Sequence, residues 1–240
     1  RGLGDVYKRQ YVYFARPDSV IEGSSVHMAR LRAGKYLWRE HPVDADIVIG
    51  VPDSGLDAAL GFSQESGIPY GIGFIKNRYI GRTFIQPSQT ERTNSVKIKL
   101  NAISSTVKGK RVVMIDDSIV RGTQMRETVE FLYENGAKEV HMRSACPPIM
   151  YGCKYLNFSR STSELELIAR QIIDENEGIE GVKYIEEYSD SSTERGKLLR
   201  DEICRRLKLT SVEFQSLEGT VKAVGLPSCE LCTYCWNGRE

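Results

Sequence analysis

The chain has 240 residues, of which 40% are hydrophobic and 27% charged, a composition typical of a globular protein with one large domain and room for an appendage. The formal net charge of +1 gives no whole-protein field that would attract nucleic acid or a membrane surface, and no apolar run approaches the roughly 20 residues that span a bilayer. Six cysteines are too few for a disulfide-stapled fold and gather late in the chain, which indicates reduced thiols or a metal site and a cytoplasmic location.

The first ten residues fit poorly with the segments after them. Residues 1–10 show no clean periodicity, and we interpret them as a non-native or artefactual leader. Residues 11–14 alternate as a short strand. Residues 24–39 are predicted to form a helix that serines can cap, with apolar side chains at helical spacing: Val26, Ala29, Ala33, Tyr36 and Leu37.

Strands and helices then alternate along the chain. We expect strands at residues 46–51, 70–75, 111–116 and 138–146. A helix is predicted over residues 56–67, and another carries Met125, Val129 and Leu132 on one stripe and ends at Gly136. This alternation predicts an α/β fold with a mainly parallel sheet flanked by helices.

The character of the sequence changes after Pro147. Residues 163–173 have a helical pattern, and residues 174–208 form an acidic, helical segment that we interpret as an insertion with a solvated surface. A final strand at 211–214 and a helix at 216–224 precede a tail that carries cysteines, so that residues 209–240 make up a C-terminal unit.

The strongest functional signal is the segment VVMIDDSIVRGT, residues 112–123. An apolar strand delivers two adjacent carboxylates, Asp116 and Asp117, to its C-terminal end, where α/β sheets bind ligands. A turn of small residues that opens a helix directs backbone N–H groups at one point and suits a phosphate. We expect this phosphate nest to consist of Ser118, Arg121, Gly122 and Thr123. Helix capping alone would explain one acidic residue, but it does not explain two after a buried strand.

A second turn, Pro52-Asp-Ser-Gly55, follows the strand at 46–51, and it could be an ordinary turn wherever it occurs. Further along, basic residues gather with an aromatic in a stretch that has few core positions. Such a cluster suits either a nucleic-acid patch or a leaving pyrophosphate, and the nearby phosphate nest favours pyrophosphate. Its members are Lys76, Arg78, Tyr79 and Arg82.

These motifs resemble type I phosphoribosyltransferases, and specifically the glutamine amidophosphoribosyltransferase family of the Bacillus type. The match rests on residues 112–123 and on two further strings, YVYFARPDS at 11–19 and KNRYIGRTF at 76–84. It covers residues 11–173, the expected phosphoribosyltransferase core, and resumes near Leu209. The resemblance implies the type I phosphoribosyltransferase fold and transfer of ammonia to C1 of phosphoribosyl pyrophosphate (PRPP). In the family this reaction gives 5-phosphoribosylamine and pyrophosphate at the first step of purine biosynthesis.

The resemblance also implies roles for individual residues. Asp116 and Asp117 would bind the ribose hydroxyls and, together with Ser54, a Mg²⁺ ion, while the turn at Ser54 and Gly55 would bind pyrophosphate. Lys76, Tyr79 and Arg82 would act in catalysis from a loop that closes over PRPP. Lys76 and Arg78 also match positions for feedback nucleotides such as AMP and GMP. The family further implies a homotetramer.

The cysteine tail resembles the family's [4Fe–4S] site, although a CxxC alone is compatible with zinc, iron–sulfur or a redox pair. Cys153, Cys229 and Cys232 match three of the four cluster ligands, and position 7, where the fourth should stand, is Tyr7. Cys235 could substitute for it. The family's N-terminal glutaminase half has no counterpart in the sequence, so we expect the chain to use free ammonia at best.

Two other functions compete with this interpretation. A PRPP-sensing regulator would share the fold without turnover, but we find neither a DNA-binding domain nor a basic face. A nucleobase phosphoribosyltransferase would need a base-stacking pocket that the sequence does not show.

Overall fold

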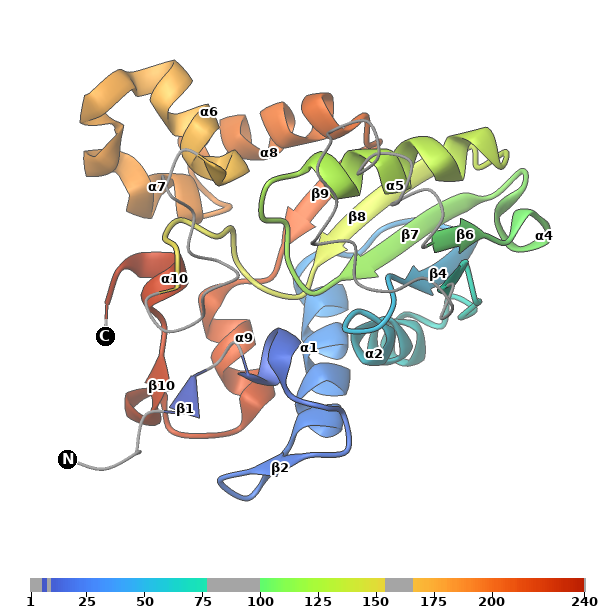
Figure 1. Ribbon diagram of the computed structural model, residues 1–240, viewed down its shortest axis with the longest axis horizontal. Helices are drawn as coiled ribbons and strands as arrows, with labels where there is room; N and C mark the ends of the chain where they lie inside the picture. Colours follow the sequence, from blue (N-terminus) through green and yellow to red (C-terminus); the bar gives the residue numbers. More distant parts are fainter. Residues whose placement is uncertain (1–5, 8–9, 77–99, 154–165, 240) are drawn as a thin grey trace, which may run out of the picture.

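A parallel sheet of four strands forms the centre of the computed structural model, which describes residues 6–7, 10–76, 100–153 and 166–239. The strand order is β4-β7-β8-β9, and every neighbouring pair runs parallel (Figure 1). The register sets Gly50 beside Ile115, and Ser144 beside both Asp116 and Phe214, so the carboxyl ends of the strands meet at one edge. The strands are β4 (Ile47–Gly50), β7 (Arg111–Asp116), β8 (Glu139–Ser144) and β9 (Ser211–Phe214).

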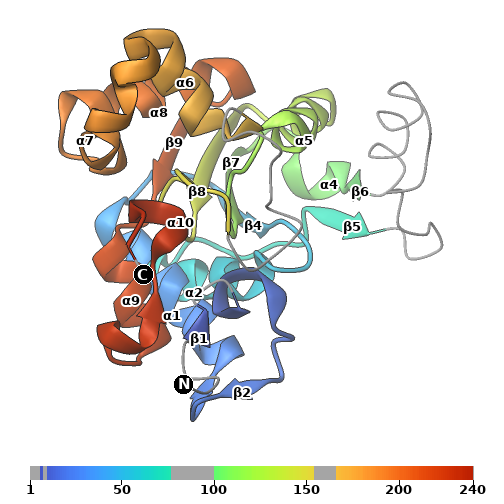
Figure 2. The same ribbon diagram turned by 60° about the vertical axis from the view of Figure 1, so that its left-hand side comes forward.

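Helices cover both faces of this sheet (Figures 1 and 2). Val113 and Ile115 of β7 join the core cluster with α1 (Val26–Glu40) and α2 (Leu56–Ser66). The alternate residue Met114 joins the opposite cluster, which holds side chains of α5 (Thr123–Glu134), α6 (Ile168–Glu177) and α8 (Glu194–Leu207). Each fully buried aliphatic side chain of this kind stabilises the fold by about 1.5–3 kcal/mol. The predicted α/β architecture is confirmed.

The helix boundaries follow local chemistry. The Ser25 side chain accepts a hydrogen bond of 3.3 Å from the backbone N–H of Met28 and caps α1. The α2 helix ends at Gly67, whose φ of +76° is left-handed and suits glycine. Thr193 caps α8 by accepting from the Gly196 N–H at 2.9 Å.

The expected strand at residues 11–14 is wrong, because the structure has a π-helix there, η1 (Gln10–Phe14). In a strand, Tyr11 and Tyr13 would share one face. Instead, Tyr11 is 1% exposed and Tyr13 is 48% exposed. The Tyr11 hydroxyl donates a hydrogen bond of 2.5 Å to the Ile21 carbonyl, and the buried ring holds the hydroxyl in this position.

The expected strand at residues 70–75 is only partly correct. Tyr70 makes a single bridge to Val48, and the strand itself, β5 (Phe74–Lys76), pairs antiparallel with β6 (Leu100–Ala102) outside the main sheet. Two glycines between them explain the shift. A Cβ at Gly71 or Gly73 would stand 2.5 or 2.6 Å from a β4 isoleucine methyl, so after the Tyr70 bridge this stretch passes close over the β4 side chains and its pairing with β4 ends.

Residues 174–208 are not only a solvated surface. They form the end of α6, the 3₁₀ segment η5 (Gly178–Tyr184), α7 (Ile185–Ser189) and α8. The buried side chains of Leu199, Ile203 and Leu207 belong to the main core cluster. The acidic positions therefore occupy one side of a helical layer whose other side stabilises the sheet.

The C-terminal unit folds back toward the start of the chain. It contains α9 (Leu217–Val224), η6 (Ser228–Glu230), β10 (Leu231–Cys232) and α10 (Tyr234–Asn237). β10 pairs in parallel with β1 (Val6–Tyr7), which sets Tyr7 beside Cys232. The remaining elements are β2 (Val20–Ile21), β3 (Ser24–Ser25) and α4 (Ser104–Val107). Among the described residues, none of the helices has the length and apolar character needed to cross a bilayer.

Candidate active site

Two loops meet at the carboxyl edge of the sheet, one after β4 and one after β7. The first begins at Val51, whose N–H donates to the Ile115 carbonyl at 2.9 Å. Ser54 in this loop donates a hydrogen bond of 2.7 Å to the Asp117 carboxylate in the other loop. The structure thus joins the two motifs that the sequence predicts to form one site, although they are 63 positions apart.

Gly55 allows this close approach. A Cβ at this position would lie 2.5 Å from the Ile115 carbonyl oxygen and 3.1 Å from the Asp116 Cα, both of them backbone atoms. Because real Cβ atoms essentially never come closer than 3.0 Å, any side chain would force the two loops apart. Glycine at this point is therefore a requirement of the site geometry.

The two aspartates have different surroundings. Asp117 is 7% exposed, and its carboxylate accepts hydrogen bonds from Ser54 and, at 2.8 Å, from Ser118. The Asp116 carboxyl accepts the Asp117 N–H at 2.8 Å. Removal of this carboxyl group from water raises the pKa of Asp116 well above its usual value, and the adjacent Asp117 charge raises it further. A cation or a set of hydroxyl donors at this edge would reduce the free energy needed to ionise Asp116.

The loop after Asp117 leads into α5 through Gly122, whose φ of +80° is left-handed. The Arg121 guanidinium pairs with Glu166. Arg121, Gly122 and Thr123 also line a cavity of about 470 Å³, and its wall, among the residues that the structure describes, includes four more basic side chains and no carboxylate. These four are Arg126, Arg205, Arg206 and Lys208.

The basic residues of the expected mobile loop are only partly placed. Lys76, at the end of β5, forms an ion pair of 2.5 Å with Asp53, which belongs to the same turn as Ser54. Arg78, Tyr79 and Arg82 lie outside the described residues, so their roles remain predictions.

The cysteines do not form the expected cluster site. Cys153 is buried, Cys229 is exposed and Cys232 is half-buried, and no group of three or more His, Cys, Asp or Glu side chains in the described part of the chain is placed to hold a metal ion. The pairing of Tyr7 with Cys232 puts a tyrosine at the expected fourth position. Cys235 is buried, and its carbonyl accepts backbone hydrogen bonds from residues 150 and 151.

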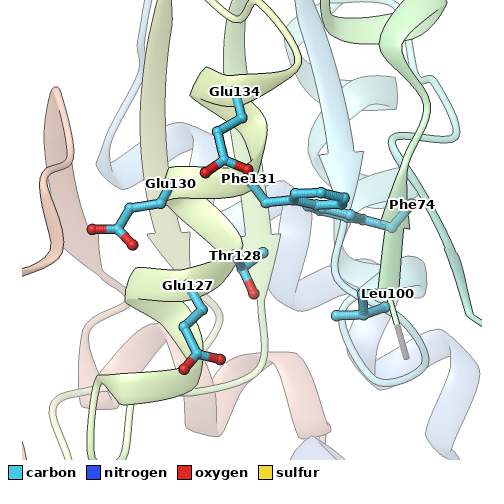
Figure 3. A pocket seen from close by; sticks show the side chains of 7 residues that line it. All are labelled: Phe74, Leu100, Glu127, Thr128, Glu130, Phe131 and Glu134. Carbon is cyan, nitrogen blue, oxygen red and sulfur yellow. The ribbon is translucent and has the colours of Figure 1, made fainter. Parts of the chain in front are cut away.

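A second pocket, on the other side of α5, does not suit a phosphate ligand. It encloses about 40 Å³, against roughly 300–1,000 Å³ for typical ligand sites. Figure 3 shows the Phe74 and Phe131 rings directed toward one another, with three glutamates on the adjoining helix face: Glu127, Glu130 and Glu134. A space of this volume cannot hold a pyrophosphate, so the edge near Asp117 is the better candidate.

Two residues near the site were not predicted from the sequence. Asp53 forms an ion pair with Lys76, and no sequence pattern distinguishes this aspartate from others in the chain. Arg30 is 5% exposed and lies beneath the Ser54–Asp117 contact, where both line a small cavity with it. The sequence did contain a signal for Arg30. Position 30 falls on the apolar stripe of α1 between Val26 and Ala33, where a charged residue is unexpected.

Comparisons with known proteins identify the family of this fold. Residues 29–148 match the family model described as "Phosphoribosyl transferase domain". The chain is 48% identical over 230 residues to an amidophosphoribosyltransferase of Methanocaldococcus jannaschii and 44% identical over 229 residues to one of Methanothermobacter thermautotrophicus. These alignments cover 96% and 95% of the chain but only 42% of either relative, so the chain spans less than half of their length.

A solved structure is similar over nearly the whole chain. It is glutamine PRPP amidotransferase from B. subtilis complexed with ADP and GMP, with a TM-score of 0.77 and 41% sequence identity. The match covers 98% of this chain and 46% of that one. Since the matched family model takes in half of the sequence, including Ser54 and Asp117, the chain belongs to the phosphoribosyl transferase domain family.

Proposed function

We propose that the chain is the transferase part of an amidophosphoribosyltransferase, which joins ammonia to C1 of PRPP. The observation that carries the proposal is the Ser54–Asp117 hydrogen bond, because it brings a pyrophosphate-type turn and a ribose-phosphate loop to one point. The names of the relatives support the reaction class. In the complete relatives glutamine would supply the ammonia.

Each part of the site has a task in this reaction. The ribose hydroxyls would donate to Asp117 and Asp116, and the backbone N–H groups from Ser118 to Thr123 would receive the 5′-phosphate. Five basic side chains line the adjoining cavity, and each is paired with a glutamate, so an anion bound there would have to compete with these ion pairs. Ser54 and Gly55 would face the pyrophosphate.

Lys76 is suited to the leaving group. In its ion pair with Asp53, the Lys76 side chain is 48% exposed and the Asp53 side chain 74% exposed. Exposed pairs of this kind stabilise a protein by only about 0–1 kcal/mol. The ammonium group can therefore exchange Asp53 for pyrophosphate at little cost. We assign Arg78, Tyr79 and Arg82 to the same task because they follow Lys76 closely in the sequence, and the resemblance to the family also assigns Lys76 and Arg78 to feedback nucleotides.

The chemical step requires no covalent nucleophile. The lone pair of ammonia forms the new C–N bond while the C1–O bond breaks. The electron pair of the broken C1–O bond leaves with pyrophosphate. The amine then loses a proton to solvent. The chain's own contribution is to orient C1 and to place positive charge where the leaving group develops negative charge.

A magnesium ion fits the same edge. Mg²⁺ takes oxygen ligands and commonly binds through one or two carboxylates together with substrate phosphates, and Ser54, Asp116 and Asp117 offer such a set. Bound there with PRPP, it would neutralise charge on the pyrophosphate. The raised pKa of Asp116 supports this proposal, because a nearby cation would stabilise the ionised carboxylate.

An iron–sulfur cluster does not fit the described residues. Four thiolates are needed, and the sequence has a tyrosine at position 7, where the fourth ligand is expected. Feedback by AMP- or GMP-type nucleotides, assembly into a homotetramer and a cytoplasmic location remain proposals. The proposal of nucleotide feedback is supported by the solved B. subtilis relative, which is complexed with ADP and GMP.

The proposal is tested by supplying PRPP, Mg²⁺ and ammonia and measuring pyrophosphate release. We expect release that depends on ammonia and is lost with Asp116→Asn. Purine bases in place of ammonia test the nucleobase alternative. PRPP binding without any release would favour the regulator, and release that ignores either ammonia or the substitution would refute the assignment.

A further inference from the structure

Arg30 is a buried cation that has no role in the proposed reaction. It lies on α1, is 5% exposed, and donates from Nε to the Tyr11 carbonyl at 2.7 Å and from a terminal nitrogen to the Ala15 carbonyl at 2.8 Å. Burying an arginine is costly unless its donors are used. One of these carbonyls lies within η1 and the other directly after it, so Arg30 fastens that segment to the core.

The guanidinium is also in the electrostatic range of the site. Burial lowers the pKa of Arg30, and the charges of Asp57 and Asp117 act in the opposite direction. The acceptors of its two hydrogen bonds are neutral carbonyls, so these bonds leave its positive charge in place. That charge acts on Asp117 from behind the loop.

A small cavity connects these groups. Tyr11, Arg30, Ser54 and Asp117 all line one space of about 20 Å³. A cavity of this size holds about one water molecule and is far too small for a sugar phosphate. Arg30 therefore lies behind the Ser54–Asp117 contact and does not touch the substrate.

We infer that Arg30 is a positioning residue, which holds the Tyr11–Ala15 segment against the back of the site and fixes the wall on which Ser54 and Asp117 meet. This inference rests on the proposed function, because it assumes that these two residues bind PRPP. If Arg30 sets their positions, its loss weakens PRPP binding by molecules that are still folded. If Arg30 only stabilises the fold, its loss reduces the number of folded molecules and leaves their affinity unchanged.

Arg32 provides a matched control on the same helix. It donates from Nε to the Ala223 carbonyl at 2.7 Å and from a terminal nitrogen to the Val224 carbonyl at 3.1 Å. Like Arg30, it joins α1 to a neighbouring segment through two backbone carbonyls. Its own side chain does not line the cavity behind Asp117, although Ala223 and Val224, whose carbonyls it binds, do.

The experiment is calorimetric titration of the 240-residue chain with PRPP and Mg²⁺, which reports the dissociation constant and the binding-competent fraction separately. For Arg30→Met we expect the dissociation constant to rise about tenfold, the effect of losing one charged hydrogen-bonding group. Arg30→Lys keeps the charge but loses the planar guanidinium that donates to two carbonyls. Its dissociation constant for PRPP should lie between those of wild type and Arg30→Met. Arg32→Met and Arg32→Lys should raise the dissociation constant less than the matched Arg30 variants do, because the Arg32 side chain does not line this cavity.

The possible results separate this inference from the function on which it rests. A wild-type chain that does not bind PRPP overturns the proposed function, and this inference with it. Wild-type binding, combined with Arg30 variants whose affinity equals that of the matched Arg32 variants, overturns the inference alone. If circular dichroism shows that Arg30→Met is unfolded, the comparison of Arg30→Lys with Arg32→Lys decides by the same criterion.

Discussion

Replacing Asp116 with asparagine should stabilise the protein and disable it at the same time. Burial and the neighbouring Asp117 charge make an ionised Asp116 costly, as its raised pKa shows. Asparagine keeps an oxygen to accept the Asp117 N–H, which is 2.8 Å away, so this hydrogen bond within the loop can persist. The gain expected from removing such a strained charge is about 0.5–2 kcal/mol, or roughly 1–8 °C in the unfolding midpoint for a chain of this size.

The pH dependence of this gain has a defined sign. In the unfolded chain Asp116 titrates near 3.8, and in the folded chain it titrates well above that value. The folded state therefore retains a proton that the unfolded state releases, and wild-type stability falls as the pH rises from 3.8 through the folded pKa. The advantage of Asp116→Asn should be small in acid and grow toward neutral pH.

Thermal unfolding followed by circular dichroism at several pH values, with a chelator present, measures this effect. The same variant should bind PRPP about 10–100-fold more weakly, because a charged acceptor for the ribose hydroxyls is lost. Asp201→Asn, which removes an exposed aspartate on α8, should change neither property. A variant that is less stable than wild type, or a gain that does not vary with pH, would refute the reasoning.

Three further substitutions test the site and the core. Ser54→Ala removes the hydroxyl donor to Asp117, and PRPP affinity measured by calorimetry should fall about tenfold; an unchanged affinity would show that this hydrogen bond does not position the site. Gly55→Ala puts a Cβ 2.5 Å from a β7 carbonyl oxygen, and a resulting shift of loops by up to about 1 Å should reduce ammonia-dependent pyrophosphate release by about 100-fold; unchanged release would contradict the packing. Ile203→Ala, at a fully buried position of α8, should cost about 2–5 kcal/mol in urea unfolding, whereas Leu198→Ala, 39% exposed on the same helix, should cost far less.

The meeting of the two candidate loops was predictable because it depends on local sequence and on parallel pairing. A buried strand followed by two aspartates and a small-residue turn specifies a ligand loop at a strand's carboxyl end. Since β4 and β7 are parallel neighbours, the turn at Ser54 had to come to the same edge as Asp117. The helical periodicity also predicted α1 and α5 with little error.

The rest depends on tertiary contacts that a single sequence does not show. Residues 11–14 alternate like a strand, yet the buried Tyr11 ring and the two Arg30 hydrogen bonds stabilise a helical turn. The acidic composition of residues 174–208 concealed the apolar stripe of α8. The cysteine tail has a metal-like spacing, but spacing alone cannot bring Cys153 and Cys229 to one point.

The pairing of β1 with β10 has a topological consequence. Residues 6–7 lie beside residues 231–232, so the described fold is a nearly closed circuit in which the first and last strands are neighbours (Figure 1). This pair is a separate small sheet, so the edge where Ser54 meets Asp117 depends on the four-stranded sheet and not on the pairing of β1 with β10.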